Sequence, residues 1–473
     1  MSAQDSRPRA STRHFSRAAV VLPLVVLAFL LMGGAFMELP RLHAASTTSG
    51  DWTTYLYDYG RSGFNSAETI INPSSAPHLK LHWSYKEGKS ITTQPVVVNG
   101  MIYWGSWDGF EHATSLDGTQ VWQQNLGQTV DTNCSPSTVG VASTATVASV
   151  LVAGTLTSVV FVGGGNATFY ALNALTGAII WKTGLGSSPS HFIWSSPVVY
   201  NNSVYIGVSS FGDCPLVQGQ LVQMDASTGT IQHTFNTVPA GCIGASVWGS
   251  PTIDQADGSI YFATGNGGSC STAEQYAAAI VKLSASNLTY ISSWQAHHEF
   301  GATPTLFQAT IGGTMHKLVG LANKNGIYYA FDRGAINKGP LWRATIAVSG
   351  GCPECGQGSI SSSAWDGTTL YVAGGHTTIA GITCLGSLQA LNPADGTSIW
   401  QDCFNDGPVL AAVSAVPGLA VVGEHNHLLV IAAATGQILF NYAGTANFWG
   451  PASISNGVLY TGNMKGTLYA FGP

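Results

Sequence analysis

The sequence carries very little charge. Only 8% of its 473 residues are Asp, Glu, Lys or Arg, against roughly a quarter in an average soluble protein. The net charge is −6 and the pI is about 6.1, and no basic stripe of the kind that follows a phosphate backbone is present. A nucleic-acid partner would need such a basic surface, so the composition argues against one.

The N-terminal segment 1–45 is predicted to be a targeting signal outside the fold. Several arginines precede an apolar run at 18–37, and small residues at 42–46 offer a site for signal peptidase. The run also approaches the ~20 residues of a membrane-spanning helix, so an uncleaved anchor through 18–37 is the alternative. No Cys directly follows the run, which argues against a lipid anchor. Either form places residues 46–473 outside the cytoplasm, in a periplasmic, cell-surface or secreted location.

Two cofactor motifs are missing around the eight cysteines. Cys352 and Cys355 stand in a Cys-x-x-Cys pair, but Gly356 rather than His follows, so this is not a c-type haem attachment site. No second pair of ligands stands at the short spacing that a zinc site needs. In an exported chain the cysteines predict disulfides, and eight cysteines leave about 105 connectivities open.

Glycine is abundant, with 57 residues, and much of it punctuates a repeated unit. The unit reads as a short apolar strand, a turn, a Val/Ile-Tyr-x-Gly strand, a Leu-x-Ala-Leu strand, a Thr-Gly or Asp-Gly turn and a strand ending in Trp. Four short strands in about 40 to 50 residues form one blade of a β-propeller. The innermost strands are predicted to start at Gln94, Ser135, Ser196, Ser250, Thr303, Ser361, Leu410 and Gly450.

These starts predict an all-β fold: one eight-bladed propeller of four-stranded antiparallel blades over residues 46–473. The last unit runs out at Pro473 after three strands. Segment 79–85, which ends like the Trp-bearing strands, is predicted to supply the missing outer strand and so to close the ring and remove its open edge. A β-sandwich, the alternative, would not produce a repeated four-strand unit.

The predicted topology places loops on two faces. In a four-strand meander, the second-to-third loops and the connections between blades share one face. All eight cysteines fall in or near these segments, as do the long insertions at 209–218 and 265–276. We therefore expect a ligand site on that face.

Three segments in order carry a family resemblance. They read Ala-Ser-Val-Trp-Gly-Ser-Pro-Thr-Ile-Asp at 245–254, leading to Ala-Thr-Gly-Asn at 263–266; Glu-Phe-Gly-Ala-Thr-Pro at 299–304; and Ala-Asn-Lys-Asn-Gly-Ile-Tyr-Tyr at 322–329. The repeat resembles the pyrroloquinoline-quinone (PQQ) propeller repeat over nearly all of 52–473. The middle third is similar to polyvinyl-alcohol dehydrogenases and, more distantly, to quinoprotein alcohol dehydrogenases. The resemblance implies an oxidoreductase that uses PQQ and calcium to oxidise a small or polymeric alcohol.

The resemblance assigns two residues to the quinone. Trp248 would form the floor on which the planar ring stacks; the alternative is a Trp that packs between blades, as Trp194 and Trp449 would. Lys324 would contact the quinone oxygens and stabilise negative charge on the reduced ring. Its alternative role is that of a turn residue before an Asn-Gly pair.

Three further residues would serve the metal and the base. Asn266 would bind calcium through its amide oxygen, or else simply open the loop that follows it. Asp213 is the candidate second metal ligand, although its register differs from the family's by one residue. Glu299 stands where the family has its Asp general base. The polyvinyl-alcohol dehydrogenases usually have Asp-x-Asp here, whereas this chain has His297-His298-Glu299, so a surface-loop acid is the alternative.

Two departures from the family bear on electron transfer. Quinoprotein alcohol dehydrogenases carry adjacent bridged cysteines above the cofactor, and here only Cys134 is available. The missing haem motif means that electrons would leave through a separate acceptor such as a cytochrome. A non-catalytic propeller that binds proteins or carbohydrate is the competing function, and a family member that has lost its cofactor is a third. The ordered set Trp248, Asn266, Glu299 and Lys324 favours the enzyme.

Overall fold

The computed structural model describes residues 50–86, 88–268, 270 and 274–473. The chain divides into two compact units, Met1–Pro40 and Arg41–Pro473, and the fold below is that of the second. The targeting signal predicted at 1–45, with its apolar run at 18–37, lies outside the described residues and stays a prediction, as does the domain boundary at 46. In the described part of the chain, no helix is both long and apolar enough to span a bilayer.

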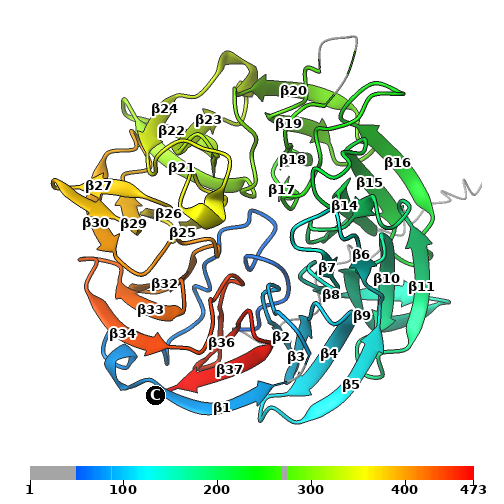
Figure 1. Ribbon diagram of the computed structural model, residues 1–473, viewed down its shortest axis with the longest axis horizontal. Coiled ribbons are helices and arrows are strands. Elements are labelled where there is room, and N and C mark those ends of the chain that lie inside the picture. Colours follow the sequence, from blue (N-terminus) through cyan, green and yellow to red (C-terminus); the bar gives the residue numbers. More distant parts are fainter. Residues whose placement is uncertain (1–49, 87, 269, 271–273) are drawn as a thin grey trace, which may run out of the picture. The chain divides into compact units, whose positions relative to one another are not determined.

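Eight antiparallel sheets form the blades of a propeller, as the repeat predicted; seven have four strands, and that of blade 3 has β12 as a fifth (Figure 1). The strands of each blade follow one another from the inside of the ring to its rim. Blades 1 to 4 consist of β2 (Val96–Val98), β3 (Met101–Gly105), β4 (Phe110–Ser115) and β5 (Gln120–Asn125); β8 (Thr146–Val152), β9 (Thr155–Gly163), β10 (Thr168–Asn173) and β11 (Ile179–Gly184); β13 (Val198–Tyr200), β14 (Ser203–Ser210), β15 (Gln220–Asp225) and β16 (Ile231–Asn236); and β17 (Thr252–Asp254), β18 (Ser259–Ala263), β19 (Ala279–Ser284) and β20 (Tyr290–Gln295).

The second half of the ring repeats this order. Blades 5 to 8 consist of β21 (Thr305–Ile311), β22 (Thr314–Ala322), β23 (Ile327–Asp332) and β24 (Trp342–Thr345); β25 (Ala364–Trp365), β26 (Leu370–Gly374), β29 (Gly386–Leu391) and β30 (Ser398–Phe404); β31 (Ser414–Val416), β32 (Leu419–Glu424), β33 (His427–Ala432) and β34 (Ile438–Ala443); and β35 (Ser453–Ser455), β36 (Val458–Gly462), β37 (Thr467–Gly472) and β1 (Lys80–Lys86). The remaining elements are β6 (Thr129–Val130), β7 (Thr138–Val139), β12 (His191–Phe192), β27 (Thr377–Ile379), β28 (Ile382–Cys384) and the 3₁₀ helices η1 (Ala76–His78), η2 (Ile336–Lys338) and η3 (Pro353–Cys355).

The ring is closed by the N-terminal strand, as predicted for 79–85. Strand β1 pairs antiparallel with β37 and becomes the outer strand of blade 8. Each innermost strand also contacts the innermost strands of its two neighbours, and β35 contacts β2. The last blade therefore shares strands from both ends of the described chain, which leaves no blade incomplete.

Seven of the predicted starts lie two to four residues before the observed inner strands, and the one in blade 2 is wrong. Ser135 lies in the turn between β6 and β7, which pair as a separate small hairpin, and the inner strand of blade 2 begins later, at Thr146. The Ser-Pro pair at 135–136 has the same residue types as the Ser-Pro and Thr-Pro pairs that precede other inner strands, which caused the error. The position that corresponds to them in blade 2 is Thr144, which no Pro follows.

The serines and threonines at these starts join successive blades. The Thr144 hydroxyl accepts the Gln94 N–H at 2.8 Å, and the Ser196 hydroxyl accepts the Thr144 N–H at 3.0 Å. The same bond recurs in the next three blades, from Ser196 to Ser250, from Ser250 to Thr303 and from Thr303 to Ser362. The repeated hydroxyl residue therefore satisfies a buried backbone donor of the preceding blade.

Tryptophans within the outer strands join the blades at the rim. Their indole N–H groups donate to a carbonyl in the third-to-fourth-strand turn of the following blade, and the indole lies against a glycine of that turn. The pairs are Trp83 with Leu116, Trp122 with Ala174, Trp181 with Ala226, Trp342 with Pro393 and Trp400 with Ala433.

Residues 50–65, which we call the belt, run inside the ring and bond to every blade (Figure 1, blue). Six blades are joined by backbone bonds with N···O distances of 2.7–2.9 Å: Trp52 with Val97, Thr53 with Val147, Tyr59 with Ile253, Gly60 with Leu306, Ser62 with Trp365 and Gly63 with Ala415. Side chains reach the other two, from Arg61 to the Pro197 carbonyl and from Asn65 to the Ile454 carbonyl. No sequence pattern predicted the belt.

The two faces of the ring differ as expected. The face that carries the second-to-third-strand loops and the connections between blades is called the pocket face, and the opposite one the turn face. The belt begins at the turn face, where Asp51 accepts the N–H of Asn99 in the β2–β3 turn at 3.1 Å. From there it runs along the inner strands, and Arg61 reaches the Pro197 and Pro251 carbonyls just before β13 and β17.

Candidate active site

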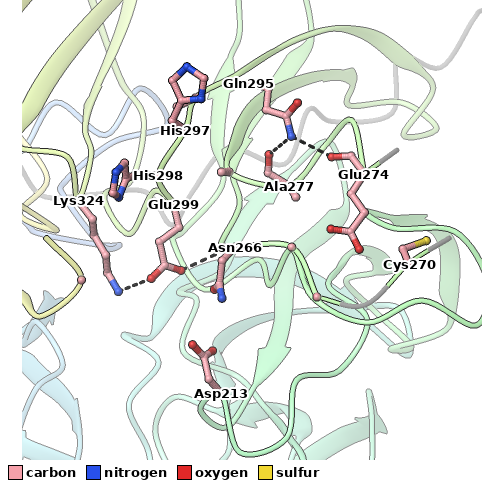
Figure 2. A pocket seen from close by; sticks show the side chains of 15 residues that line it. Asp213, Asn266, Cys270, Glu274, Ala277, Gln295, His297, His298, Glu299 and Lys324 are labelled. Atoms are coloured by element: carbon pink, nitrogen blue, oxygen red, sulfur yellow. Dashed lines mark hydrogen bonds and ion pairs between the residues drawn. The ribbon is translucent and has the colours of Figure 1, made fainter. Parts of the chain in front are cut away.

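A cavity of about 840 Å³ opens on the pocket face among blades 3, 4 and 5. It brings together four of the five predicted site residues: Asp213 from the β14–β15 loop, Asn266 from the β18–β19 loop, Glu299 from the β20–β21 connection and Lys324 from the β22–β23 loop. Figure 2 shows their side chains converging from these loops. The structure thus brings these four side chains together in one cavity, and the role of each stays a prediction.

Glu299 and Lys324 form an ion pair at the cavity wall, with side chains 18% and 14% exposed. The backbone reinforces the pairing, because the Lys324 N–H donates to the Glu299 carbonyl at 3.2 Å. The other carboxylate oxygen of Glu299 accepts the Asn266 N–H at 3.3 Å. The carboxylate is therefore held from two sides by neighbouring loops, which fixes its orientation toward the cavity.

Trp248, the fifth predicted residue, stands beside this pair. The Lys324 ammonium lies 5.3 Å from the centre of its ring, within the range of a cation–π contact. Gly301 packs so closely that a Cβ there would lie 2.2 Å from the ring carbon Cη2. The half-buried indole therefore packs directly against Gly301, where no side chain would fit, and the Lys324 ammonium lies beside it.

Oxygen donors gather on the other side of Glu299. Figure 2 shows the Asp213 carboxylate and the Asn266 amide pointing toward one another from adjacent blades. Asp213 is exposed, so its carboxylate is not tied up in packing. Carboxylate and amide oxygens are the donors that a hard cation such as calcium takes.

Gln295 and Glu274 also line the cavity, and the sequence interpretation did not predict them. The Gln295 amide donates to the carbonyls of Glu274 and Ala277 at 3.0 and 2.9 Å, which anchors the return of the long β18–β19 loop. The Glu274 atom Oε1 is buried without a hydrogen-bond partner. Glu274 is the only acid in the insertion at 265–276, and that was the one sequence signal that pointed to it.

All eight cysteines pair. The disulfides are Cys134–Cys214, Cys242–Cys270, Cys352–Cys355 and Cys384–Cys403. The first two each tie a connection between blades to a second-to-third-strand loop, next to Asp213 in one case and at the cavity wall in the other. Cys134 thus finds its partner 80 residues away, where quinoprotein alcohol dehydrogenases have adjacent cysteines.

Comparison with known proteins agrees with this architecture. A family model described as "Outer membrane protein assembly factor BamB" matches residues 112–274. Polyvinylalcohol dehydrogenase from Sphingopyxis sp. (strain 113P3) is 24% identical over 86% of this chain and 70% of its own length. Quinohemoprotein alcohol dehydrogenase from Comamonas testosteroni is 27% identical over 62% of this chain. The match spans only 46% of that relative's length.

Solved structures show the same fold at low identity. Quinohemoprotein alcohol dehydrogenase ADHIIG from Pseudomonas putida HK5 aligns with a TM-score of 0.72 at 17% identity, over 90% of this chain and 80% of that one. BamB from Moraxella catarrhalis aligns with a TM-score of 0.56 at 15% identity, over 84% of this chain and 98% of that one. The chain is therefore an eight-bladed β-propeller that is similar to polyvinyl-alcohol and quinohemoprotein alcohol dehydrogenases, as its repeat and its three motifs predicted.

Proposed function

We propose that this protein is an extracytoplasmic PQQ- and calcium-dependent dehydrogenase that oxidises an alcohol and passes the electrons to a separate acceptor. The observation that carries the proposal is the convergence of Glu299, Lys324 and Asn266 on one cavity wall beside Trp248. The relatives named above are alcohol dehydrogenases, and their chemistry needs a base, a cation and a flat aromatic surface in this arrangement.

The residues present fit both groups. Trp248 offers a seated, half-buried aromatic surface with the Lys324 ammonium beside it, and Asn266 with Asp213 offers oxygen donors. PQQ, when bound, would supply the carbonyl that accepts a hydride, and with it two electrons, from the alcohol carbon. Trp248 and Lys324 would hold the quinone, and Asn266 and Asp213 would hold calcium.

Glu299 is the residue proposed to take the alcohol proton. One carboxylate oxygen faces Lys324 and the other the Asn266 N–H, and each oxygen keeps a second lone pair for a hydroxyl in the cavity. The longer Glu side chain reaches one methylene further than the Asp of the family, and the ion pair fixes that reach. Lys324 also places positive charge next to the Trp248 ring, where a group that gains electrons would be stabilised.

Export and a separate acceptor belong to the same proposal. Four disulfides that use every cysteine are typical of an oxidising compartment. The sequence contains no Cys-x-x-Cys-His motif, so the electrons would pass to another protein such as a cytochrome.

Reconstitution tests the proposal. Purified protein is incubated with PQQ and calcium, bound PQQ is measured after gel filtration, and dye reduction is followed with small alcohols and polyvinyl alcohol. We expect calcium-dependent binding and turnover, with Glu299→Gln losing turnover by at least 100-fold while it keeps bound PQQ. Asp406→Asn, an exposed acid on the same face in the β30–β31 connection, is the control and should retain full activity. Absence of both binding and turnover in the wild type would refute the enzyme, and undiminished turnover in Glu299→Gln would exclude this residue as the base.

One observation favours a second candidate, a non-catalytic propeller that binds protein or carbohydrate. The family model that matches residues 112–274 is that of an assembly factor, and this match lies mostly in blades 1 to 3. The same incubation separates the two functions, because a scaffold would bind no PQQ.

A further inference from the structure

The Cys352–Cys355 disulfide differs from the other three in its surroundings. Cys355 is the only exposed cysteine of the eight, and Cys352 is partly exposed. Cys134 and Cys384, by contrast, are buried at 9% and 0% exposure, and Cys242 packs against the buried side chains of Val238, Ala245 and Ala277. The Cys352–Cys355 bond therefore offers a thiolate in solution the most exposed sulfur of the four bonds, that of Cys355.

The Cys352–Cys355 disulfide also closes the shortest loop of chain. The sequence separation is 3, against 19, 28 and 80 for the others. A disulfide stabilises a fold mainly by restricting the unfolded chain, and this effect grows with the length of the closed loop. The bond between Cys352 and Cys355 therefore adds the least to global stability, and losing it leaves every connection between blades intact.

Its position couples it to the candidate active site. It lies in the connection between β24 and β25, where Gly351 lines the cavity. The preceding residue, Gly350, donates its N–H to the Lys324 carbonyl at 3.0 Å, and Ser359 donates to the Asn323 carbonyl at 3.3 Å. The loop between them is closed by the disulfide and by the Gln357 N–H, which donates to the Cys352 carbonyl at 3.0 Å. This closed loop therefore supports the backbone that aims Lys324 at Glu299.

We propose that Cys352 and Cys355 form a reversible thiol–disulfide exchange site at the rim of the cavity, whose partner is a dithiol reductant, and that its redox state sets how firmly Lys324 is held. A thiolate of the dithiol attacks the exposed sulfur of Cys355, and the sulfur of Cys352 leaves as a thiolate. The second thiol of the reductant then attacks the mixed disulfide and releases Cys355. Two electrons and two protons pass to the protein, and the reductant becomes a disulfide.

The exchange does not depend on the proposed dehydrogenase activity and is measured without PQQ. The purified full chain is equilibrated with graded ratios of reduced to oxidised dithiothreitol, free thiols are trapped with N-ethylmaleimide, and mass spectrometry gives the reduced fraction of each cysteine. The other three disulfides are internal controls. We expect Cys352 and Cys355 to be half reduced at a ratio at least tenfold lower than any other pair. If another pair is reduced first, or all four together, the exchange site is refuted.

The coupling to Lys324 has its own readout. Lysine acetylation rates are compared between the oxidised wild type and the variant Cys352→Ala/Cys355→Ala, with Lys282 as the reference because it is ion-paired with Asp257 on the turn face. We expect Lys324 to be acetylated at least threefold faster in the variant and Lys282 at an unchanged rate. An unchanged rate at Lys324, or an equal rise at both lysines, would contradict the coupling. Wild-type protein reduced with dithiothreitol gives the same comparison if the variant folds poorly.

Discussion

Replacing Arg61 tests whether the belt fastens the ring. Arg61 is fully buried and donates hydrogen bonds to the carbonyls of Pro251, Pro197 and Tyr55 and to the Thr54 hydroxyl, at 3.0, 3.0, 2.5 and 3.0 Å. Burial lowers the pKa of Arg61 to about 10, so the guanidinium keeps its charge at neutral pH. One side chain thus ties the belt to blades 3 and 4.

The cost of Arg61→Ala follows from these bonds. Losing a hydrogen bond from a charged donor costs about 1.5–3 kcal/mol, and four such losses are partly offset because the guanidinium no longer has to be desolvated. A net destabilisation of about 4 kcal/mol is expected. The unfolding entropy of a domain of this size is about 0.9 kcal/mol/K, so Tm should fall by about 4–5 °C.

Differential scanning calorimetry measures this shift. Lys338→Ala, which removes an exposed cation on the turn face, is the charge-matched control and should leave Tm within about 1 °C. Arg61→Lys should fall between the two, because an ammonium keeps the charge but cannot reach several carbonyls with a planar fork. If the Tm of Arg61→Ala equals that of the control variant, the belt is not held by this side chain.

Three further substitutions probe the interior and the rim. Glu111 is fully buried with both carboxylate oxygens unpartnered, and desolvation raises its pKa well above the usual value. A raised carboxyl pKa lowers the stability of the folded state as the pH rises. Glu111→Leu should therefore stabilise the fold by about 1–3 kcal/mol at pH 7.5 and by less at pH 4.5, as measured by urea unfolding at both pH values. Gly229 has φ 73°, and a Cβ there would lie 2.4 Å from the Trp181 ring, whereas Gly154 has φ 83° but no atom within 4 Å of a Cβ. Gly229→Ala should therefore cost at least about 2 kcal/mol more stability than Gly154→Ala. Equal losses of stability in thermal melts would refute the steric argument. Trp181→Phe removes the bond to the Ala226 carbonyl and should cost about 1–2 kcal/mol, so an unchanged melt would show that the indole N–H contributes nothing.

The propeller was predictable because its units repeat. A Gly-containing turn followed by a strand that carries Trp recurs often enough that segment 79–85 could be matched to the last blade across the whole chain. The error at Ser135 shows the limit of that method, since one Ser-Pro pair in a hairpin looks the same as one before an inner strand. The belt could not be predicted, because its bonds run from irregular backbone to eight different blades and leave no period in the sequence.

The site was predictable in location and less so in detail. Motifs on three successive loops identified Asn266, Glu299 and Lys324, and the topology placed those loops on one face. Neither the ion pair between Glu299 and Lys324 nor the loop anchored by Gln295 has a local signature, because each depends on how far two loops extend into the same cavity. The disulfide pairing likewise depends on spatial neighbours, such as Cys134 and Cys214, that spacing alone left open.

The belt has a consequence for the order in which the molecule can be completed. Ribosomes make residues 50–65 before any blade exists, yet Asn65 bonds to Ile454 and the Ser455 hydroxyl bonds to the Gly50 carbonyl. These two bonds therefore form only after nearly the whole chain has been made, whereas Trp52 can pair with Val97 of blade 1 early. Individual blades have only local pairings to make and can form as they appear. The ring itself closes in a late step that requires both ends, so a chain interrupted before blade 8 would keep the belt bonded to the earlier blades but would leave the ring open.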